Sequence, residues 1–573
     1  MALLLCDLHF WSLREDIITK DVDQGTFKYY EKSQHKAMLE RPYGQDKLTF
    51  AQGRGQTTLL ESKRLKTSLR ELEEMLTEQP VIFSSWRSSV LFQLMLGSGL
   101  IVNIHLNKLG DISKITFDKY LIGKLLEYIT DVAFTSKVLI VTYLESRVTC
   151  ITFTKPLEFT EDSIGANDPK IQMLDLLGPP GRRLNRKILL SPDSQMAMFW
   201  WSVNGQEVYP WAPKLNDEDR ANFVLYQLKS KKSNSEPKRL GFARNNSDPV
   251  QVRFISDRTV LLIGQDASRH GEVQVDSALL TYYDNEKQLR RSRANRLSLG
   301  SSIKCSICVN DYLIIVSTVD GNLLLIDVSQ NKIECQSKAT FVPTLLSLHP
   351  DQALVFAANE KGLIQCWDIA LTPIYLQMAG EYNNGSILDV GHNINRIPIG
   401  LCDMKWCERN TLQPSSMEAM AFNYLHLRFQ NGPLALFRFS GGVLEASGSL
   451  GPIQIVNQHL QHNNYNAVLL FLNQMDWPTQ GESILIGMNK LFHKLMRQKE
   501  LTPENESWME MCLGLFYAPN RPIPDEIIDE FSEQVHDITR KFFHRLIRHG
   551  QVAKAFKLAV DINDYDLVSK ISK

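Results

Sequence analysis

Short apolar runs alternate with polar turns along residues 80–450, a pattern typical of consecutive β-strands. One unit begins at Leu345 and reads LLSLHPDQALVFAANEKGLIQCWD, that is, a strand, a turn and a second strand that ends at Trp367 and Asp368. The preceding unit begins at Ile307 and has the same order, ICVNDYLIIVSTVDGNLLLID. The pattern therefore predicts a repeated β-hairpin unit.

The two units share one register. Gly321 and Gly362 are 41 residues apart, and so are Asp327 and Asp368. This spacing lies within the roughly 40 to 45 residue repeat of a WD-type propeller blade. Five further units of the same kind begin near Ser84, Ile129, Ile188, Val250 and Met417. Because propellers typically have roughly four to eight blades, we expect a WD-type β-propeller of about seven blades between residues 80 and 450.

Two basic segments, residues 229–248 and 285–302, interrupt the repeat. Both are polar and poor in β-branched residues, so we expect loops that project from the blades. Their basic residues are Lys231, Lys232, Lys238 and Arg239 in the first segment and Arg290, Arg291, Arg293 and Arg296 in the second. Such charges usually do no more than keep a protein soluble. The alternative is contact with an anionic membrane surface, which phosphorylation of Ser292 or Ser298 would weaken.

The segment before the first unit has a different period. Five apolar residues fall on one face of a helix that Pro80 ends: Leu59, Leu65, Leu69, Leu72 and Met75. We expect this amphipathic helix to pack on the propeller, because a narrow apolar stripe usually covers the nearest core. Partner binding is the alternative. Residues 1–79 are thus predicted to form an N-terminal strand and a helix outside the propeller.

Beyond Gly451 the apolar period changes to about 3.6, which indicates helices. The clearest helix precedes Gly550 and carries Ile528, Phe531, Val535, Ile538, Phe542 and Leu546 at steps of three or four. Several shorter helices are separated by prolines. Residues 451–573 are therefore predicted to form an α-solenoid, in which each helix pair buries its apolar face on the next pair.

Charge and cysteine content narrow the classes of protein. With 63 basic and 64 acidic residues, the chain has no overall charge that would attract nucleic acid or an anionic membrane, so any electrostatic partner must be recognised by local charges. The N-terminal apolar run contains Asp7, and the longest apolar stretch is interrupted by polar residues, so neither a signal peptide nor a membrane span is predicted. Nine scattered cysteines form no disulfide framework. We expect a cytoplasmic protein.

Motifs of catalysis and metal binding are absent from the sequence. It contains no phosphate-binding loop, no zinc protease motif and no nucleophile elbow. Cys305 and Cys308 lack the second close pair that a zinc ribbon needs, and His459 and His462 could share a helical face without further ligands. Acidic residues at a helix start, Asp525, Glu526, Asp529 and Glu530, complement the helix dipole. We expect no cofactor and interpret the chain as a non-catalytic interaction scaffold.

Three long stretches carry a family resemblance: FVPTLLSLHPDQALVFAANEKGLIQCWDIALTPI, RFQNGPLALFRFSGGV and LGPIQIVNQHLQHNNYNAVLLFLNQMDWPTQGESILIGMN. They resemble the fritz family of WD repeat-containing planar cell polarity effectors, and the likeness runs nearly from end to end. Members of that family continue with more helices, whereas this sequence ends with DLVSKISK. The resemblance therefore predicts a shortened solenoid or an alternative C-terminus.

The resemblance implies a subunit of the ciliogenesis and planar polarity effector assembly. It implies inturned and fuzzy as partners, with a Rab-like small GTPase attached, and ties to septins and to the recruitment of intraflagellar transport A proteins. It further implies a location at the basal body, the axoneme and the cell membrane periphery. Three other functions compete with this one: a propeller-based hydrolase, a coat-like trafficking adaptor, and nucleic-acid binding through the basic segments.

Overall fold

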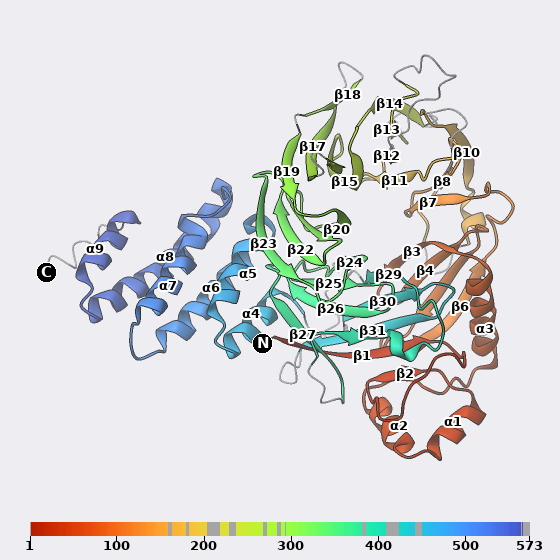
Figure 1. Cartoon of the computed structure of the whole chain (residues 1–573), viewed down its shortest axis with the longest axis horizontal. Coiled ribbons are helices and arrows are strands. Elements are labelled where there is room, and N and C mark those ends of the chain that lie inside the picture. Colours follow the sequence, from red (N-terminus) through yellow and green to blue (C-terminus); the bar gives the residue numbers. More distant parts are fainter. Residues whose placement is uncertain are drawn as a thin grey trace.

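The computed structural model describes residues 2–158, 163–178, 183–202, 218–228, 237–267, 272–283, 288–292, 294–380, 385–407, 423–441, 450–562, 564 and 566. Its strands form a β-propeller-like arrangement, and an array of helices extends from one side of it (Figure 1). The predicted change from β-structure to helices near residue 451 is confirmed.

Five separate antiparallel sheets follow one another along the chain. The first sheet contains β3 (Val81–Ser88), β4 (Leu91–Leu96), β5 (Ile101–Leu106) and β6 (Ile112–Asp118). The second contains β7 (Ile129–Phe134), β8 (Val138–Tyr143), β9 (Arg147–Thr152) and β10 (Lys170–Asp175). The third contains β11 (Lys187–Leu190), β12 (Met196–Trp200), β13 (Phe223–Gln227) and β14 (Lys238–Ala243). The next two contain β15 (Asp248–Ser256), β16 (Thr259–Ala267), β17 (Val273–Tyr283), β18 (Gln288–Arg291) and β19 (Asn295–Leu299), then β20 (Ile303–Cys308), β21 (Leu313–Thr318), β22 (Asn322–Asp327) and β23 (Lys332–Lys338).

The remaining strands join into one ten-stranded sheet. Its order is β24 (Leu345–Leu348), β25 (Leu354–Ala358), β26 (Leu363–Asp368), β27 (Pro373–Met378), β1 (Leu3–Trp11), β31 (Leu434–Gly441), β30 (Asn423–Phe429) and β29 (Leu401–Trp406). Two short strands, β2 (Thr26–Lys28) and β28 (Leu388–Asp389), pair beside β1 and β26. The first strand of each sheet neighbours that of the next, as far as β24. The two end strands of the ten-stranded sheet, β24 and β29, neighbour each other, and β29 neighbours β3, so the strands close into a ring.

The position of β1 corrects the predicted domain boundary at residue 80. We expected residues 1–79 to form a strand and an amphipathic helix that pack on a propeller beginning at residue 80, but β1 is an interior strand of the ten-stranded sheet. It pairs antiparallel with β31, and its other edge pairs in parallel with β27 and β2. The apolar run of β1 is therefore buried almost throughout. A strand with two paired edges satisfies its backbone hydrogen bonds only inside a sheet, so β1 is part of the propeller.

Three helices occupy the rest of the N-terminal segment: α1 (Lys32–Leu39), α2 (Gly44–Gly53) and α3 (Lys63–Glu78). The predicted amphipathic helix is α3, which begins after the cap residue Ser62 and contacts β6. Its buried residues Leu69, Leu72 and Leu76 belong to one cluster with the strands of the first sheet. Its apolar face thus covers the propeller.

The helical array contains six helices within the described residues. They are α4 (Pro452–Gln461), α5 (Tyr465–Gln474), α6 (Trp477–Met496), α7 (Pro503–Tyr517), α8 (Asp525–Arg548) and α9 (Val552–Asp561). Proline stands in the first turn of α4, α6 and α7, where no intrahelical N–H donor is needed. The apolar cluster of the ten-stranded sheet continues without a break into these helices, from Trp367 through Ile455 to Phe542. Sheet and helices therefore share one core.

The end of α8 depends on a glycine turn. Gly550 has a φ of 74°, its backbone N–H donates to the carbonyl of Ile547, and the N–H of Gln551 donates to the carbonyl of Leu546. These two bonds are those of a Schellman motif, which satisfies free carbonyls at a helix end. The turn redirects the chain so that α9 packs back on α8.

We expect Gly550→Val to lower the free energy of unfolding of the helical array by about 1 to 2 kcal/mol, since a β-branched residue is strained at this positive φ. Nothing lies within 4 Å of the added Cβ, so the cost is one of backbone conformation alone. Thermal unfolding and limited proteolysis near residue 550 would measure it. Gly550→Asn should cost less, because asparagine tolerates this conformation. Equal stability of the valine variant and the wild type would contradict the prediction.

A buried histidine lies in the core between the last strands and the first sheet. His426 in β30 is fully buried, and its ring lies 3.8 Å from that of Phe92 and 5.5 Å from that of Trp11, centroid to centroid. No described residue provides a hydrogen-bond partner for either ring nitrogen. Burial, helped by Arg428 and Lys405, lowers the pKa of His426 well below 6.5. The imidazole is therefore neutral in the folded protein.

Acid should destabilise the fold through His426. Below about pH 6.5 the unfolded chain takes up a proton at this histidine while the folded chain does not. The free energy of unfolding therefore decreases as the pH is lowered, by up to about 1.4 kcal/mol per pH unit. Denaturant titrations between neutral and mildly acidic pH would measure the slope. His426→Leu should remove that part of the slope, whereas a His462→Gln control, at an exposed position, should not. Identical slopes for the wild type and His426→Leu would refute this.

Candidate interaction sites

Five of the eight predicted basic residues lie in strands, which corrects the expectation of projecting loops. Lys238 and Arg239 belong to β14, Arg290 and Arg291 to β18, and Arg296 to β19. All five are exposed on the outermost strands of two consecutive sheets, and we call them the basic edge. Lys231, Lys232 and Arg293 lie outside the described residues.

The two sheets bring the basic edge together. β14 and β18 lie side by side. They are so close that a Cβ added to Gly241 in β14 would lie 3.1 Å from the backbone nitrogen of Leu289 in β18. β18 and β19 pair with successive parts of β17. Charged side chains on an outer strand also discourage pairing with foreign strands. That protective role explains why lysine and arginine occur here in strands that composition predicts to be loops.

Acidic partners offset part of this charge. Asp276 in β17 is buried, and its carboxylate oxygens lie 3.1 Å from Nε of Arg296 and 4.0 Å from Nη2 of Arg291. Nη2 of Arg239 lies 3.0 Å from Oε1 of Glu218. The basic edge is therefore a surface of partly compensated arginines, not of isolated cations.

The two candidate phosphorylation sites are both exposed but differ in their contacts. Ser292 is held by Leu279: its hydroxyl accepts a hydrogen bond from the backbone N–H of Leu279 at 2.9 Å, and its own N–H donates to the carbonyl at 2.8 Å. Ser298 is exposed in β19, opposite Gln274 and two residues from Arg296. Residues two apart in a strand point to the same face, so Ser298 shares its face with Arg296.

A second site is the junction between the propeller and the helices. Asp368, the aspartate of the Trp-Asp pair, is fully buried at the end of β26. One of its carboxylate oxygens lies 3.1 Å from Nε2 of His459 in α4, and the other accepts a hydrogen bond from the backbone N–H of Thr372 at 2.8 Å. His459 is buried whereas His462 is exposed, so these two histidines do not form one site.

Asp327, one repeat earlier, also contacts the helical array. Nε of Arg521, in the connection between α7 and α8, donates to Oδ2 of Asp327 at 2.9 Å. Burial opposes ionisation, but hydrogen bonds from Ser329 and Gln330 and the Arg521 guanidinium lower the pKa of Asp327 below its usual value. Two repeat aspartates 41 residues apart thus both bind the helical array.

Further polar contacts surround these two pairs. Arg521 lies over the ring of Tyr312 at 4.2 Å, and the hydroxyl of Tyr312 donates to Oδ1 of Asp476 at 2.6 Å. The side-chain amide of Gln458 in α4 pairs with the backbone of Leu3, at 2.8 and 3.0 Å. The start of β1 is therefore also held by the first helix of the array.

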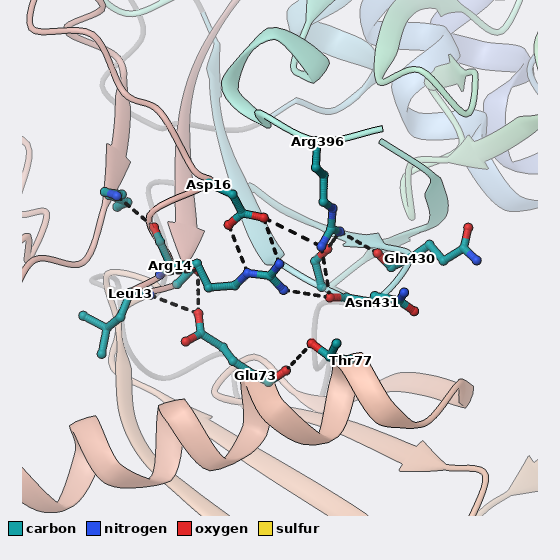
Figure 2. A network of polar contacts seen from close by, with 11 residues as sticks. Leu13, Arg14, Asp16, Glu73, Thr77, Arg396, Gln430 and Asn431 are labelled. Atoms are coloured by element: carbon teal, nitrogen blue, oxygen red, sulfur yellow. Dashed lines mark hydrogen bonds and ion pairs between the residues drawn. The ribbon is translucent and has the colours of Figure 1, made fainter. Parts of the chain in front are cut away.

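A third network of polar contacts lies near the far end of β1 (Figure 2). The Arg14 guanidinium binds both carboxylate oxygens of Asp16, at 3.0 and 2.8 Å, and donates to the carbonyl of Asn431 at 3.0 Å. Arg396 donates to carbonyls of the same turn. Glu73 of α3 accepts a hydrogen bond from the backbone of Leu13 at 3.0 Å. The segment after β1, helix α3 and the β30–β31 turn are thus tied together.

Comparison with known proteins agrees with this architecture. The family described as WD repeat-containing and planar cell polarity effector protein Fritz matches residues 47–573. The chain belongs to the Fritz family. Its relatives include the fritz homologs of Xenopus laevis and Mus musculus, each 30% identical over the whole chain and covered over 81% and 80% of their own lengths. Fritz of Drosophila melanogaster is 27% identical over 99% of the chain and 61% of its own length.

The names of these Fritz relatives describe WD repeat effectors and not enzymes. Within the described residues, no three His, Cys, Asp or Glu side chains are grouped to hold a metal ion. Burial raises the pKa of Cys305 to about 11 and that of Cys512 to about 12, so both thiols stay protonated. Cys305 and Cys308, in β20, are also buried or half-buried.

The acidic residues Asp525 and Glu526 occupy the first turn of α8, where they complement the helix dipole. No helix in the described part of this Fritz-family chain is long and apolar enough to cross a membrane.

Proposed function

We propose that this chain is a non-catalytic scaffold subunit of a planar cell polarity effector and ciliogenesis assembly. Membership of the Fritz family supports the polarity role. The junction supports the scaffold role, because Asp327 and Asp368 bind two separate parts of the helical array. A propeller and a helical array that share one core present their surfaces in a fixed relation, as a scaffold requires.

The proposed partners are inturned and fuzzy, with a Rab-like small GTPase joining through the complex. The assembly would support recruitment of intraflagellar transport A proteins at basal bodies and the organisation of septins. Purified chain should co-elute with an inturned–fuzzy pair on size-exclusion chromatography. Separate elution at every mixing ratio would refute the partnership. We place the protein in the cytoplasm, at the basal body and axoneme and at the periphery of the cell membrane.

We also propose that the ten-stranded sheet is two four-stranded blades joined at their outer strands, β27 of one and β1 of the other. Counted in this way, the ring has seven blades, and β1 completes the last of them. The pairing of β1 with both β27 and β31 supports this count. We likewise interpret α4–α9 as an α-solenoid, since consecutive helices pack on one another along the array.

The basic edge is proposed to contact anionic lipid. Each Lys or Arg near such a membrane contributes about 1 kcal/mol of attraction. Replacing Lys231, Lys232, Lys238, Arg239, Arg290, Arg291, Arg293 and Arg296 with glutamine should therefore abolish recovery on phosphoinositide liposomes at low salt. A control with the same number of glutamines at exposed basic positions elsewhere, Lys63 and Arg64 among them, should bind as the wild type does.

Phosphorylation would act on the same contact. Ser298→Glu should weaken liposome binding, because it places a negative charge on the face that carries Arg296. Ser292→Glu additionally removes a hydroxyl that binds the backbone of Leu279, so thermal unfolding should accompany that measurement. If the eight glutamines leave liposome recovery unchanged, the basic edge serves only to protect the sheet edges.

A further inference from the structure

The outer strand of the second sheet, β10, differs from the other outer strands. β6 is contacted by α3, and β27 is paired with β1. β14, β18 and β19 carry the basic edge, and β23 carries Lys332, Glu334 and Lys338. β10 is the terminal strand of its sheet, and no described strand pairs with its second edge. Its charges, Lys170 and Asp175, stand only at its two ends.

The middle of β10 is apolar and exposed. Ile171 is 37% exposed and Met173 is 51% exposed, and both point to the same face because they are two residues apart. At the end of this edge, the carbonyl of Asp175 accepts a hydrogen bond from the hydroxyl of Tyr226 at 3.1 Å. The central part has exposed apolar residues and no charge, and such an edge is a template for another strand. The geometry points to β10 as an interaction edge at which a second copy of this chain adds its own β10 in antiparallel orientation.

The register of such a pair follows from the pleat of the strand. Opposite residues of an antiparallel ladder point to the same face, so a two-fold axis can pair only residues whose numbers have the same parity. Centring the pair on Gln172 sets Ile171 of each copy opposite Met173 of the other. The two Ile171–Met173 pairs then lie next to each other on one face of the sheet. On the other face, Gln172 lies opposite Gln172 of the second copy, where the two side-chain amides can hydrogen-bond.

The neighbouring register is less favourable. Centring the pair on Met173 would set Ile171 of each copy opposite Asp175 of the other, which places a carboxylate against an exposed apolar side chain. In the register centred on Gln172, Lys170 lies opposite Leu174, and its aliphatic stem can cover that residue while its ammonium group stays in water. The side chains of β10 therefore select one self-complementary register. This inference does not depend on the proposed partners.

Light scattering coupled to size-exclusion chromatography would test the association. The full chain should show twice the mass of one chain at high concentration and dissociate on dilution, and Met173→Lys should remain monomeric at all concentrations. Val319→Lys is the matched control, because Val319 is 52% exposed in a turn of another sheet. A monomeric wild type, or a dimer that Met173→Lys leaves intact, would overturn the proposal.

Cysteine crosslinking would test the register, in a Cys402→Ser background that removes the exposed native cysteine. Gln172→Cys should form an intermolecular disulfide by itself, because the residue lies opposite its own copy. Ile171→Cys and Met173→Cys should each crosslink poorly alone and crosslink with each other when mixed. Crosslinking of Met173→Cys alone but not of Gln172→Cys would refute this register.

Discussion

We expect Arg438→Met to lower the free energy of unfolding by about 3 kcal/mol, the lower end of the range for breaking a buried ion pair. Arg438 and Asp7 lie opposite each other in β31 and β1, and both are buried. Nη2 of Arg438 lies 2.9 Å from Oδ2 of Asp7. The lower end applies because Asp7 keeps one partner: Nε of Arg54 donates to the same oxygen at 2.7 Å.

The double variant Asp7→Leu with Arg438→Met provides the decisive comparison. Replacing a buried ion pair by apolar residues is often neutral, so the double variant should be more stable than Arg438→Met alone. Arg147→Met, at an exposed position of β9, should change stability by no more than about 0.5 kcal/mol. Urea unfolding of the wild type, Asp7→Leu, Arg438→Met, the double variant and Arg147→Met would measure all these differences. If the double variant lost as much free energy of unfolding as the two single variants lose together, the ion-pair explanation would be contradicted.

Asp368→Ala should loosen the helical array and lower the free energy of unfolding by about 1 to 3 kcal/mol. The substitution leaves the buried imidazole of His459 and the backbone N–H of Thr372 without the carboxylate that both contact. Because His459 belongs to α4, the loss falls on the junction and not on the sheet alone. Limited proteolysis should then release a helical fragment faster than from the wild type.

A double-mutant cycle would isolate the contribution of the contact between Asp368 and His459. His459→Ala should destabilise the protein, and the effects of the two substitutions should be less than additive, because either one removes the same interaction. Arg521→Ala breaks a separate contact with Asp327, so its effect should add to that of Asp368→Ala. Strict additivity between Asp368→Ala and His459→Ala would mean that the two side chains do not interact in solution.

The sequence predicted those features that depend on local patterns. The alternation of the hairpin units around Leu345 is visible within one strand pair, and the 3.6-residue period of α8 is visible within two turns. The helix α3 was recognisable for the same reason. Each of these elements buries one face against whatever lies nearest, so its own residues are sufficient to indicate it.

Features that depend on distant residues were not predictable in this way. Nothing near β1 indicates that its partner is β31, which lies more than 400 residues later in the chain. One indirect signal was present: Asp7 stands inside an apolar run, and a buried carboxylate requires a partner. Asp327 and Asp368 were recognisable as repeat markers, but their contacts with Arg521 and His459 arise only when the helices pack on the sheets.

The strands that carry the basic residues were predicted to be loops for another reason. The segments that carry Arg290, Arg291 and Arg296 are polar and poor in the β-branched residues that favour strands, so composition favoured loops. Strand propensity depends strongly on context, and long charged side chains are well tolerated at an outer edge, where they stay in water. Position in the sheet outweighed composition here.

The place of β1 in the ten-stranded sheet also affects how the protein can be made. The ribosome completes Trp11 long before it reaches Leu434, the first residue of β31. At about 5 to 20 residues per second, synthesis of the chain between these strands takes roughly 20 to 90 seconds. During that interval the apolar residues of β1 must be kept from pairing with other chains. Translation speed and chaperone supply should therefore affect the yield of this protein more than that of a propeller whose blades each close with their own strands.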